Sequence, residues 1–223
     1  MSSYVKYPRT PHLPWSPGVS SDDVRTHDLS SFDGQPVVVT EKLDGENTSM
    51  YRDHIHARSI DSKHHPSRDW VKGFHATIAH EIPEGWRLCG ENLYARHSIA
   101  YDQLRSYFYL FSVWDSDNHC LSWPETEEWA ELLGLPTPRI LFQGPFDASA
   151  IEEIKVDETE SEGYVVRLAA GFAYTDFATS VAKWVRPNHV QSDGHWMHQT
   201  VVPNGLATGD LDKDSRDTDD QET

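Results

Sequence analysis

The sequence predicts an α+β fold in which clustered antiparallel sheets are flanked by helices. Short stretches rich in β-branched and aromatic residues, bounded by turn residues, are typical of strands, and they come in groups. Stretches with helical spacing or helix-capping signals separate these groups, and no internal repeat is present. The 223 residues, 37% of them hydrophobic, are enough for one large domain with its own core.

Residues 1–36 predict an extended, irregular arm at the N-terminus. Four prolines interrupt any periodicity there, namely Pro8, Pro11, Pro14 and Pro17. Three larger residues, His12, Leu13 and Trp15, are expected to pin the arm onto the domain. We interpret the arm as a packing element and not as a direct part of a catalytic site.

The first predicted strand, Val37–Thr40, leads to Lys42 and then to a turn at Asp44-Gly45. Desolvation of an ammonium group is costly and lowers its pKa, which makes a lysine at the end of a buried strand a usable nucleophile. Lys-x-Asp-Gly is the signature of covalent nucleotidyl transferases, whose lysine attacks the α-phosphate of a nucleoside triphosphate. Four letters are a short match, and a surface hairpin with a solvated lysine also fits them.

The remaining elements alternate between strands and helices. Two hairpin strands are expected at 48–51 and 55–58, and buried strands at 86–91, 107–114, 163–167 and 181–186. Helical spacing predicts a helix over 70–82. A capping box at Ser122–Glu125 predicts a helix that ends near Gly134, and the same device at Ser149–Glu152 predicts a shorter one.

Charged residues stand at the ends or in the middle of these apolar strands. A lysine that attacks a triphosphate needs a divalent metal, carboxylates to hold that metal, and cations to grip the phosphates. Glu91 ends one strand, Glu162 precedes another, and Lys183 lies inside the apolar strand 181–186. Each of these acids also fits a strand-end surface position, so their joint order along the chain is the stronger signal.

This order resembles motifs I, Ia, III, IIIa, IV and V of the ATP-dependent RNA ligases, most of all the RNA ligase 2 group. The matching segments are Glu41–Gly45, Ala57–Ser59, Gly90–Asn92, Phe111–Asp115, Glu162–Val166 and Ala182–Val185. The arm, with His189–Gln191 and His195–Met197, is similar to a bacterial and phage branch of RNA ligases. The resemblance implies a nucleotidyltransferase domain, that is, an ATP-grasp-like adenylyltransferase.

The resemblance also implies a role for each matching residue. Lys42 would carry a covalent AMP derived from ATP, and Lys183 would grip the α-phosphate. Asp44, Glu91 and Glu162 would hold Mg²⁺ or Mn²⁺ through water. The remaining contacts would be Glu41 to the adenine amino group, Trp114 to the face of the base, Asn47 to the RNA-phosphate end, and Arg58 to the ribose or the phosphates.

The chain departs from the ligase pattern in two places. Val185 stands where the family usually has a second lysine in motif V, and Arg186 is expected to substitute for it with a different geometry. Little sequence follows motif V, since residues 187–202 allow only a short extension. We therefore expect either a minimal ligase domain over residues 1–202 or one that borrows a partner for the missing second domain.

The net charge of −17 disfavours a nucleic-acid binder with a wholly basic face but allows a local basic site. Residues 203–223 hold seven acids and two bases and predict an acidic, disordered tail. The segment Arg58–Arg68 holds five side chains able to carry positive charge, and both an RNA-backbone contact and a solvated loop fit it.

The two cysteines, Cys89 and Cys120, show no metal or disulfide spacing, which indicates a reducing, cytoplasmic location. The thirteen histidines match no zinc pattern, which disfavours a structural zinc site. No stretch resembles a membrane span or a signal peptide.

Three functions remain open at this stage. The first is an ATP-dependent RNA ligase that joins 3′-OH and 5′-phosphate RNA ends, with a separate kinase or phosphatase as a possible end-healing partner. The second is a DNA ligase or capping-type guanylyltransferase of the same superfamily. The third is a non-catalytic relative that binds nucleic acid or a partner. Glu41 beside Lys42, and the similarity of the arm, favour the first.

Overall fold

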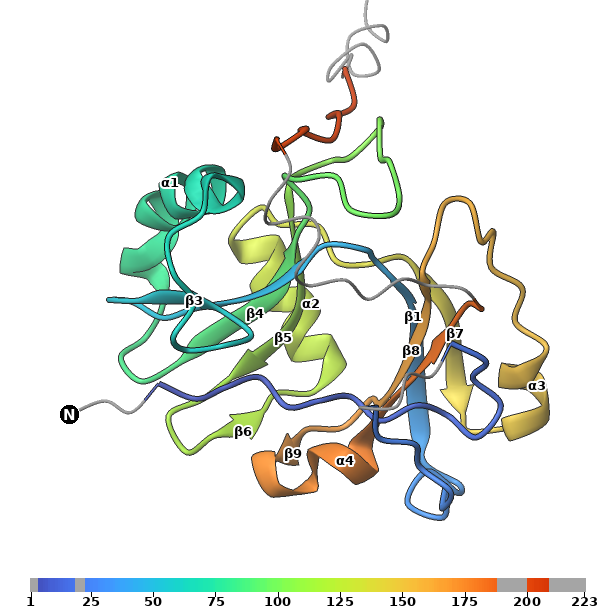
Figure 1. Cartoon of the computed structure of the whole chain (residues 1–223). Coiled ribbons are helices and arrows are strands. Elements are labelled where there is room, and N and C mark those ends of the chain that lie inside the picture. The colour runs from blue at the N-terminus through green and yellow to red at the C-terminus, as the bar shows by residue number, and fades with distance from the viewer. Residues whose placement is uncertain (1–3, 19–22, 188–199, 209–223) are drawn as a thin grey trace, which may run out of the picture.

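Two antiparallel sheets face each other in the computed structural model, which describes residues 4–18, 23–187 and 200–208 (Figure 1). Within these residues, one sheet has the strand order β10-β8-β1-β7 and the other the order β3-β2-β4-β5-β6-β9. We call them the four-stranded and the six-stranded sheet. The prediction of an α+β fold with clustered antiparallel strands is confirmed.

The strands of the four-stranded sheet are β1 (Pro36–Lys42), β7 (Ile140–Pro145), β8 (Gly163–Leu168) and β10 (Val181–Val185). Those of the six-stranded sheet are β2 (Glu46–Met50), β3 (Ile55–Ala57), β4 (Arg87–Asn92), β5 (Phe108–Trp114), β6 (His119–Cys120) and β9 (Phe172–Ala173). The α-helices are α1 (Asp69–Ile78), α2 (Trp123–Leu132), α3 (Ala148–Glu152) and α4 (Phe177–Ser180). Three 3-10 turns complete the list: η1 (Pro66–Arg68), η2 (Ala79–Glu81) and η3 (Tyr174–Asp176). Sequence patterns do not predict β6, β7, β9 or α4.

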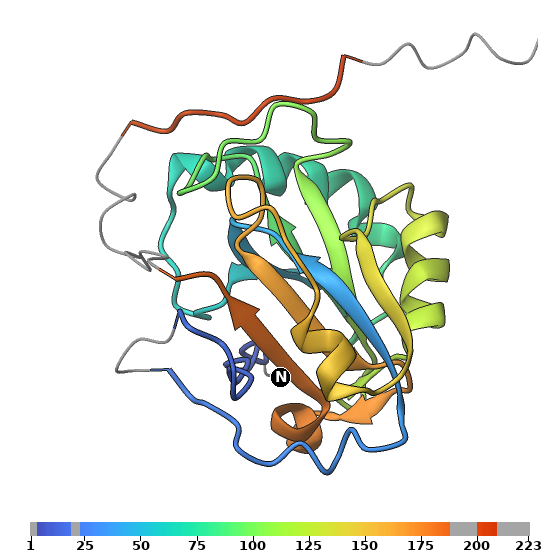
Figure 2. The ribbon, with the colours of Figure 1, turned by 90° about the vertical axis from the view of Figure 1, so that its right-hand side faces the viewer.

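Helices cover the outer face of each sheet. Ile151 of α3 packs with Val39 and Val166 of the four-stranded sheet, and Figure 2 shows α3 in front of that sheet. Val71 of α1 and Ala130 of α2 pack on the outer face of the six-stranded sheet. The inner faces of the two sheets therefore turn toward each other.

Strand alternation decides which charged residues reach the space between the sheets, because successive side chains point to opposite faces. On β1, Val39 packs outward, so Lys42 lies on the inner face. On β4, Leu88 packs outward and Cys89 inward, so Glu91 lies on the inner face as well. The inner faces share an apolar cluster that includes Cys89 of β4 and Val181 of β10.

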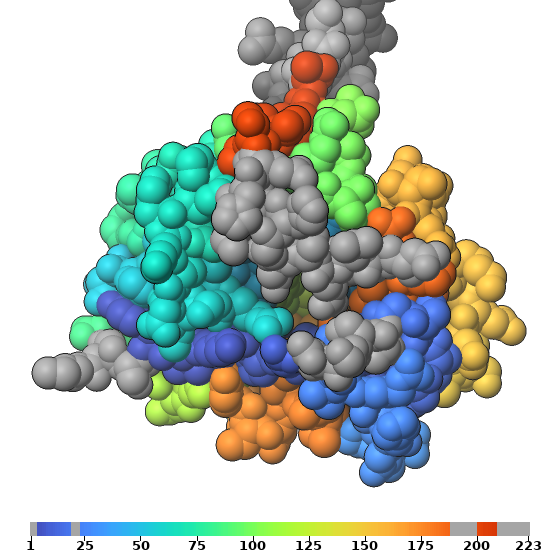
Figure 3. Space-filling view, in the orientation of Figure 1, coloured from blue at the N-terminus to red at the C-terminus, as the bar shows by residue number. Residues whose placement is uncertain are grey.

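The N-terminal arm lies along the outer edge of β10. Lys183 N–H donates to Pro11 O at 2.9 Å, and Leu13 N–H donates to Lys183 O at 2.8 Å. Leu13 is fully buried, and Trp15 Nε1 donates to the Tyr164 hydroxyl at 2.8 Å. The prediction that the arm is pinned to the domain is confirmed, and Figure 3 shows it lying across one face of the molecule.

The capping box of α2 forms as predicted, with Ser122 and Glu125 satisfying each other's backbone N–H groups. The N-terminal cap of α3 differs from the prediction. Asp147, and not Ser149, accepts hydrogen bonds from the first turn of that helix. The capping boundary predicted for α3 was therefore two residues too late.

The predicted disordered tail does not begin at Pro203. Asn204 is 3% exposed, its backbone N–H donates to Tyr94 O at 2.9 Å, and Gly205 N–H donates to Tyr101 O at 2.8 Å. Residues 203–208 pack on the domain because Asn204 fills a buried polar position. Amino-acid composition alone does not predict such a contact. The segments 209–223 and 188–199 lie outside the described residues.

Candidate active site

Lys42 ends β1 on the inner face, and its side chain is 23% exposed. Its Nζ donates a hydrogen bond to Glu162 Oε2. Across the sheet, Lys42 pairs with Gly163, whose φ is +150°. A Cβ at that position would lie 2.0 Å from Trp184 O, so only glycine lets β8 approach β10 this closely beside the lysine.

The pKa of Lys42 differs from the sequence prediction. Burial lowers it, as expected, but the carboxylates of Glu162, Glu91 and Asp44 outweigh burial and raise the pKa above its ordinary value. The neighbouring carboxylates therefore favour the protonated form of Lys42. The prediction of a lowered pKa was wrong because it counted desolvation alone.

Glu91 faces Lys42 from the six-stranded sheet. Its Oε1 accepts a hydrogen bond from Gly45 N–H at 3.1 Å, in the turn that follows Lys42. Burial, assisted by the charges of Glu162 and Asp44, raises the pKa of Glu91 to about 8 although Lys42 opposes the shift. Burial is therefore the main reason that Glu91 disfavours its ionised form, and the two neighbouring carboxylates add to it.

Asp44 is buried and holds a loop. Its Oδ2 accepts hydrogen bonds from Ser98 N–H and Ile99 N–H, both at 2.8 Å, and from Ser98 Oγ–H at 2.7 Å. That oxygen is thus occupied by the protein. In the parts of the chain that the structure describes, no three His, Cys, Asp or Glu side chains gather into a direct metal site.

Lys183 lies on the inner face of β10 and is 9% exposed. Burial and the nearby charge of Lys42 lower the pKa of Lys183, and Arg58 adds to this effect. Arg58 directly follows β3, and its charge acts on Lys183. Arg58 makes no hydrogen bond or ion pair with the described residues. Two cations thus converge on the space beside Lys42.

Two buried polar atoms near these residues lack a hydrogen-bond partner within the described chain: Asn47 Oδ1 and Arg186 Nε. Asn47 pairs with Glu91 across β2 and β4. Arg186 donates to Glu158 O at 2.7 Å and to Ser98 Oγ at 3.3 Å, while its backbone N–H donates to Glu162 O at 3.0 Å. One acceptor and one donor are therefore available to a ligand.

Glu41 precedes Lys42 and leaves the strand on the opposite side. Its Oε2 lies 3.5 Å from Arg139 Nε. Burial raises the pKa of Glu41, and Arg139 counteracts the shift. The expected contact of Glu41 with adenine stays a prediction.

The family model for RNA ligases matches residues 35–185, which is more than half of the chain and holds every strand around Lys42. The chain belongs to the RNA ligase family. No curated protein sequence matches it at a significant level.

Solved RNA ligases share the fold of this family member. An archaeal ATP-dependent RNA ligase superposes with a TM-score of 0.54 at 16% identity, over 81% of this chain and 48% of that one. The Naegleria gruberi RNA ligase with pyrophosphate gives 0.51 at 18% identity, over 82% and 61%. A variant of the same enzyme with ATP and Mn gives 0.50 at 17% identity, over 81% and 60%. The chain thus spans roughly half to three-fifths of the lengths of these ligases.

Trp114, the expected wall for the base, lies in the core of this RNA ligase family member. It is 0% exposed, packs edge-on against Phe172, and carries the Arg87 guanidinium 4.5 Å above its ring. The expectation that Trp114 stacks on a base is corrected, because its ring faces are already covered.

Phe111 is the aromatic residue of the same motif that sequence reasoning missed as a site residue. It is half-buried and packs on the same inner-face cluster as Val165 of β8. Val165 pairs with Lys183 on one side and with Thr40 on the other, so this cluster extends to the strand positions next to the two lysines. The register of β4 and β5 shifts between Cys89 and Gly90, so Phe111 and Trp114 both pack on the inner-face cluster. Strand alternation in the motif therefore does not choose between the two rings, and their burial does.

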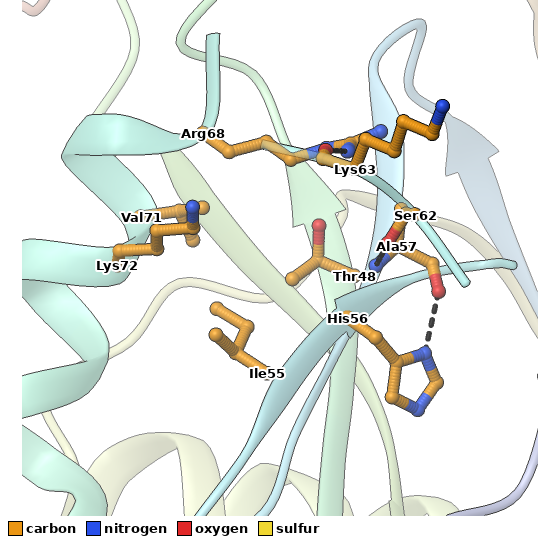
Figure 4. A pocket seen from close by; sticks show the side chains of 9 residues that line it. All are labelled: Thr48, Ile55, His56, Ala57, Ser62, Lys63, Arg68, Val71 and Lys72. Carbon is orange, nitrogen blue, oxygen red and sulfur yellow. Dashed lines mark hydrogen bonds between the residues drawn. The ribbon is translucent and has the colours of Figure 1, made fainter. Parts of the chain in front are cut away.

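A pocket with a basic rim lies on the outer face of the six-stranded sheet, between the β2–β3 hairpin and α1 (Figure 4). Lys63, Arg68 and Lys72 provide its charge, and Thr48 and Val71 are among its other lining residues. Arg68 also donates to Glu46. The segment Arg58–Arg68 therefore runs from the active site to this pocket.

None of the helices in the described ranges has the length and apolar composition that a bilayer span requires.

Proposed function

We propose that the chain is an ATP-dependent RNA ligase that carries AMP on Lys42 and joins 3′-OH to 5′-phosphate RNA ends. The observation that carries this proposal is the contact of Lys42 Nζ with Glu162, in a space that Glu91 and Lys183 also face. The membership of the RNA ligase family supports it.

In the first step, Lys42 Nζ attacks the α-phosphorus of ATP. A P–N bond forms, the bond from the α-phosphorus to the bridging oxygen breaks, and pyrophosphate leaves with that electron pair. Lys42 must first lose its ammonium proton, for which Glu162 is the hydrogen-bonded acceptor. Lys183 and Arg58 stabilise the charge that develops on the phosphate oxygens.

A divalent cation fits the carboxylates. Glu91 and Glu162 both lie close to Lys42, one from each sheet, and burial together with the charges of Glu162 and Asp44 disfavours the ionised form of Glu91, which a bound cation would favour. Glu91 and Glu162 would hold Mg²⁺ or Mn²⁺ through its water, with Asp44 contributing through the loop that it anchors. When bound, the cation offsets the phosphate charge and removes the carboxylate field that keeps Lys42 protonated.

The nucleotide fits the atoms that the fold leaves available. Phe111 takes the role first expected of Trp114 and contacts the base from the inner face. The adenine amino group would donate to Glu41, whose side chain leaves β1 on the opposite side and would reach the base around the end of the strand. Arg186 Nε, unsatisfied in the described structure, would donate to a phosphate, and the orphan Asn47 Oδ1 would accept from a nucleotide hydroxyl or at the RNA end.

The remaining steps use RNA as substrate. AMP passes from Lys42 to the RNA 5′-phosphate, and the 3′-OH of the second end then displaces AMP to form the phosphodiester bond. Arg58 to Arg68, with the basic rim next to it, would receive the phosphate backbone. A separate end-healing kinase or phosphatase would prepare the ends, and the buried free thiols of Cys89 and Cys120 fit a reducing, cytoplasmic setting.

The test is transfer of label from radioactive ATP to the protein in Mg²⁺ or Mn²⁺. We expect the label to stay on the denatured wild type, to be absent from Lys42→Ala, and to persist in the control Lys155→Ala, which changes an exposed lysine. Peptide mapping should place AMP on Lys42. Labelling by GTP in place of ATP would favour a capping-type enzyme, and an adenylate on another lysine would overturn the site.

Sealing is tested on nicked RNA, nicked DNA, looped RNA and single strands, with a 3′-OH and a 5′-phosphate. We expect RNA ends to be sealed in preference to DNA ends. Preference for nicked DNA would make the chain a DNA ligase. Adenylylation without any sealing would point to a missing domain or partner.

A further inference from the structure

Side chains of the N-terminal arm form a connected series of contacts that begins and ends on β10. Val185 N–H donates to Ser16 Oγ at 3.0 Å, and Ser16 Oγ lies 2.9 Å from His12 Nδ1. His12 Nε2 lies 3.3 Å from Asp23 Oδ2, and Asp23 Oδ1 lies 3.7 Å from Lys183 Nζ. The series therefore returns to the strand from which it started.

The donors in this series fix the state of the histidine. The Asp23 carboxylate can only accept, so Nε2 of His12, which faces it, carries the ring proton of the neutral histidine. His12 Nδ1 then accepts from Ser16 Oγ–H, and Ser16 Oγ accepts from Val185 N–H. Burial lowers the pKa of His12 to about 4, so the ring is neutral near pH 7. The Nε2–Asp23 contact is close but is not aligned as a hydrogen bond.

The arm does not need these polar groups in order to dock. Backbone hydrogen bonds of Pro11 and Leu13 to Lys183, together with the buried Leu13 side chain, already hold it on β10. Burying an imidazole and a carboxylate is costly, and an apolar replacement would serve a purely structural purpose better. Their placement against a phosphate-gripping lysine indicates another purpose.

Lys183 is surrounded by charges of both signs. Lys42 and Arg58 repel its ammonium group, whereas Asp23 and Glu162 attract it. Glu162 accepts a hydrogen bond from Lys42. Asp23, which belongs to the arm, makes the ion pair with Lys183. His12 and, behind it, Arg25 are the other titratable or charged groups that face this cluster from the arm and its return.

We propose that Asp23, in electrostatic contact with His12, is a positioning residue that orients the Lys183 ammonium group toward the α-phosphate of ATP. The inference rests on the proposed function, because it assigns the arm a part in lysine adenylylation. The arm thereby completes the active site from the edge of β10. Asp23 touches no reacting atom and acts through Lys183.

The test measures enzyme–AMP formation by Asp23→Asn as a function of pH and of ATP concentration. We expect the maximal rate to fall by about 10- to 100-fold, the scale of a misplaced group, with a smaller change in the KM for ATP. Asp23 raises the pKa of Lys183, so its removal lets the lysine lose its proton at lower pH. The alkaline limb of the rate profile should therefore move to lower pH.

Two further variants separate positioning from folding. Asp23→Glu keeps the charge and should recover most of the rate, whereas His12→Gln should reduce the rate in the same direction as Asp23→Asn. The matched control is Asp28→Asn, which removes the same charge from an exposed aspartate of the same segment and should behave as the wild type.

A wild-type rate and pH profile in Asp23→Asn would overturn the proposal. A fall in rate that only follows the folded fraction, with the alkaline limb unmoved, would also overturn it and leave the arm a packing element. Both outcomes require that the wild type adenylylates Lys42. If the wild type takes no label from ATP, the proposed function fails first, and the two failures are distinguishable.

Discussion

At the scale of single residues, the candidate site is governed by a conflict between burial and charge. Desolvation acts to lower the pKa of both lysines, yet the pKa of Lys42 is raised and that of Lys183 lowered. The difference follows from their neighbours, because Lys42 faces three carboxylates and Lys183 is repelled by Lys42 and Arg58. Neighbouring charges therefore give opposite pKa shifts to the two lysines that we propose as nucleophile and phosphate grip.

The raised pKa of Glu91 makes the free energy of unfolding depend on pH. A carboxyl group whose pKa rises to about 8 in the fold keeps its proton where the unfolded chain has lost it. Its contribution to the free energy of unfolding therefore falls as the pH rises from about 4.5 to about 8. We expect Glu91→Gln, measured without divalent cations, to gain in Tm over the wild type between pH 5 and pH 9 while losing adenylylation.

The control for this prediction is Glu128→Gln, which changes an exposed glutamate on α2 and should shift Tm equally at both pH values. A Tm difference between Glu91→Gln and wild type that stays constant with pH would contradict the raised pKa.

The two aromatic residues of β5 should separate binding from stability. Trp114→Phe removes part of a fully buried ring and its hydrogen bond to Ser112, so a loss of about 1–3 kcal/mol in unfolding free energy is expected. Its KM for ATP should stay close to that of the wild type. Phe111→Ala should raise the KM for ATP with a smaller loss of stability.

Thermal melts and ATP titrations of enzyme–AMP formation check both variants. The reverse outcome, with Trp114→Phe defective in ATP binding and Phe111→Ala merely unstable, would restore the assignment first made from the motif.

At the scale of elements, the sequence predicts best where the signal is local. The capping box at Ser122–Glu125 involves residues three apart, and the structure bears it out. β7 escapes prediction because Ile140–Pro145 is exposed or half-exposed along its length and shows no buried face. Trp114 was misassigned for a related reason, because its complete burial comes from contacts with Phe172 and Arg87, which are distant in the sequence.

The loop that follows β4 shows the same dependence on distant contacts. Asn204 accepts from Tyr101 N–H at 3.0 Å and donates to Leu93 O at 2.8 Å, and the Tyr101 hydroxyl accepts from Asp44 N–H at 2.9 Å. The segment around Asn204 thus supports the turn next to Lys42 across 160 residues of sequence. No local pattern near Asn204 predicts this role.

Removing that support should impair the site. Asn204→Ala leaves buried backbone groups unsatisfied, which is expected to cost about 1–3 kcal/mol in unfolding free energy and to slow enzyme–AMP formation. A chain that ends at 199 should lose more of both. A chain that ends at Thr208 keeps every contact of Asn204 and should adenylylate as the wild type does. Equal activity of the two truncated chains would show that the segment contributes nothing to the site.

At the scale of the whole molecule, charge is distributed unevenly. The chain carries −17 overall, yet Arg58, Lys63, Arg68 and Lys72 follow one another along the edge of the six-stranded sheet. Lys183 and Arg186 add to the positive charge at the active face. An acidic protein that binds a polyanion must focus its positive potential in this manner.

The last fifteen residues, 209–223, contain all seven acids and both bases first counted over 203–223, and so carry −5. Any approach of this charge to the basic segment would oppose the binding of RNA phosphates. Cutting after Thr208 removes the acids without touching Asn204, which corrects the cut after Pro203 that the composition alone suggests. The truncated chain should seal nicked RNA with a lower apparent KM and an unchanged rate of lysine adenylylation.

The salt dependence of the apparent KM for RNA tests whether the acidic residues act by electrostatic repulsion. Screening shortens the range of electrostatic repulsion to about 10 Å at 0.1 M salt and about 3 Å at 1 M, so the advantage of the chain cut after Thr208 should shrink as salt is added. A matched control keeps the full length and replaces the seven acids by their amides, and it should behave as the truncated chain does. If truncation raises the KM for RNA, or if its benefit is independent of salt, the acidic residues do not act by repulsion. They would then belong to a surface that binds RNA or a partner.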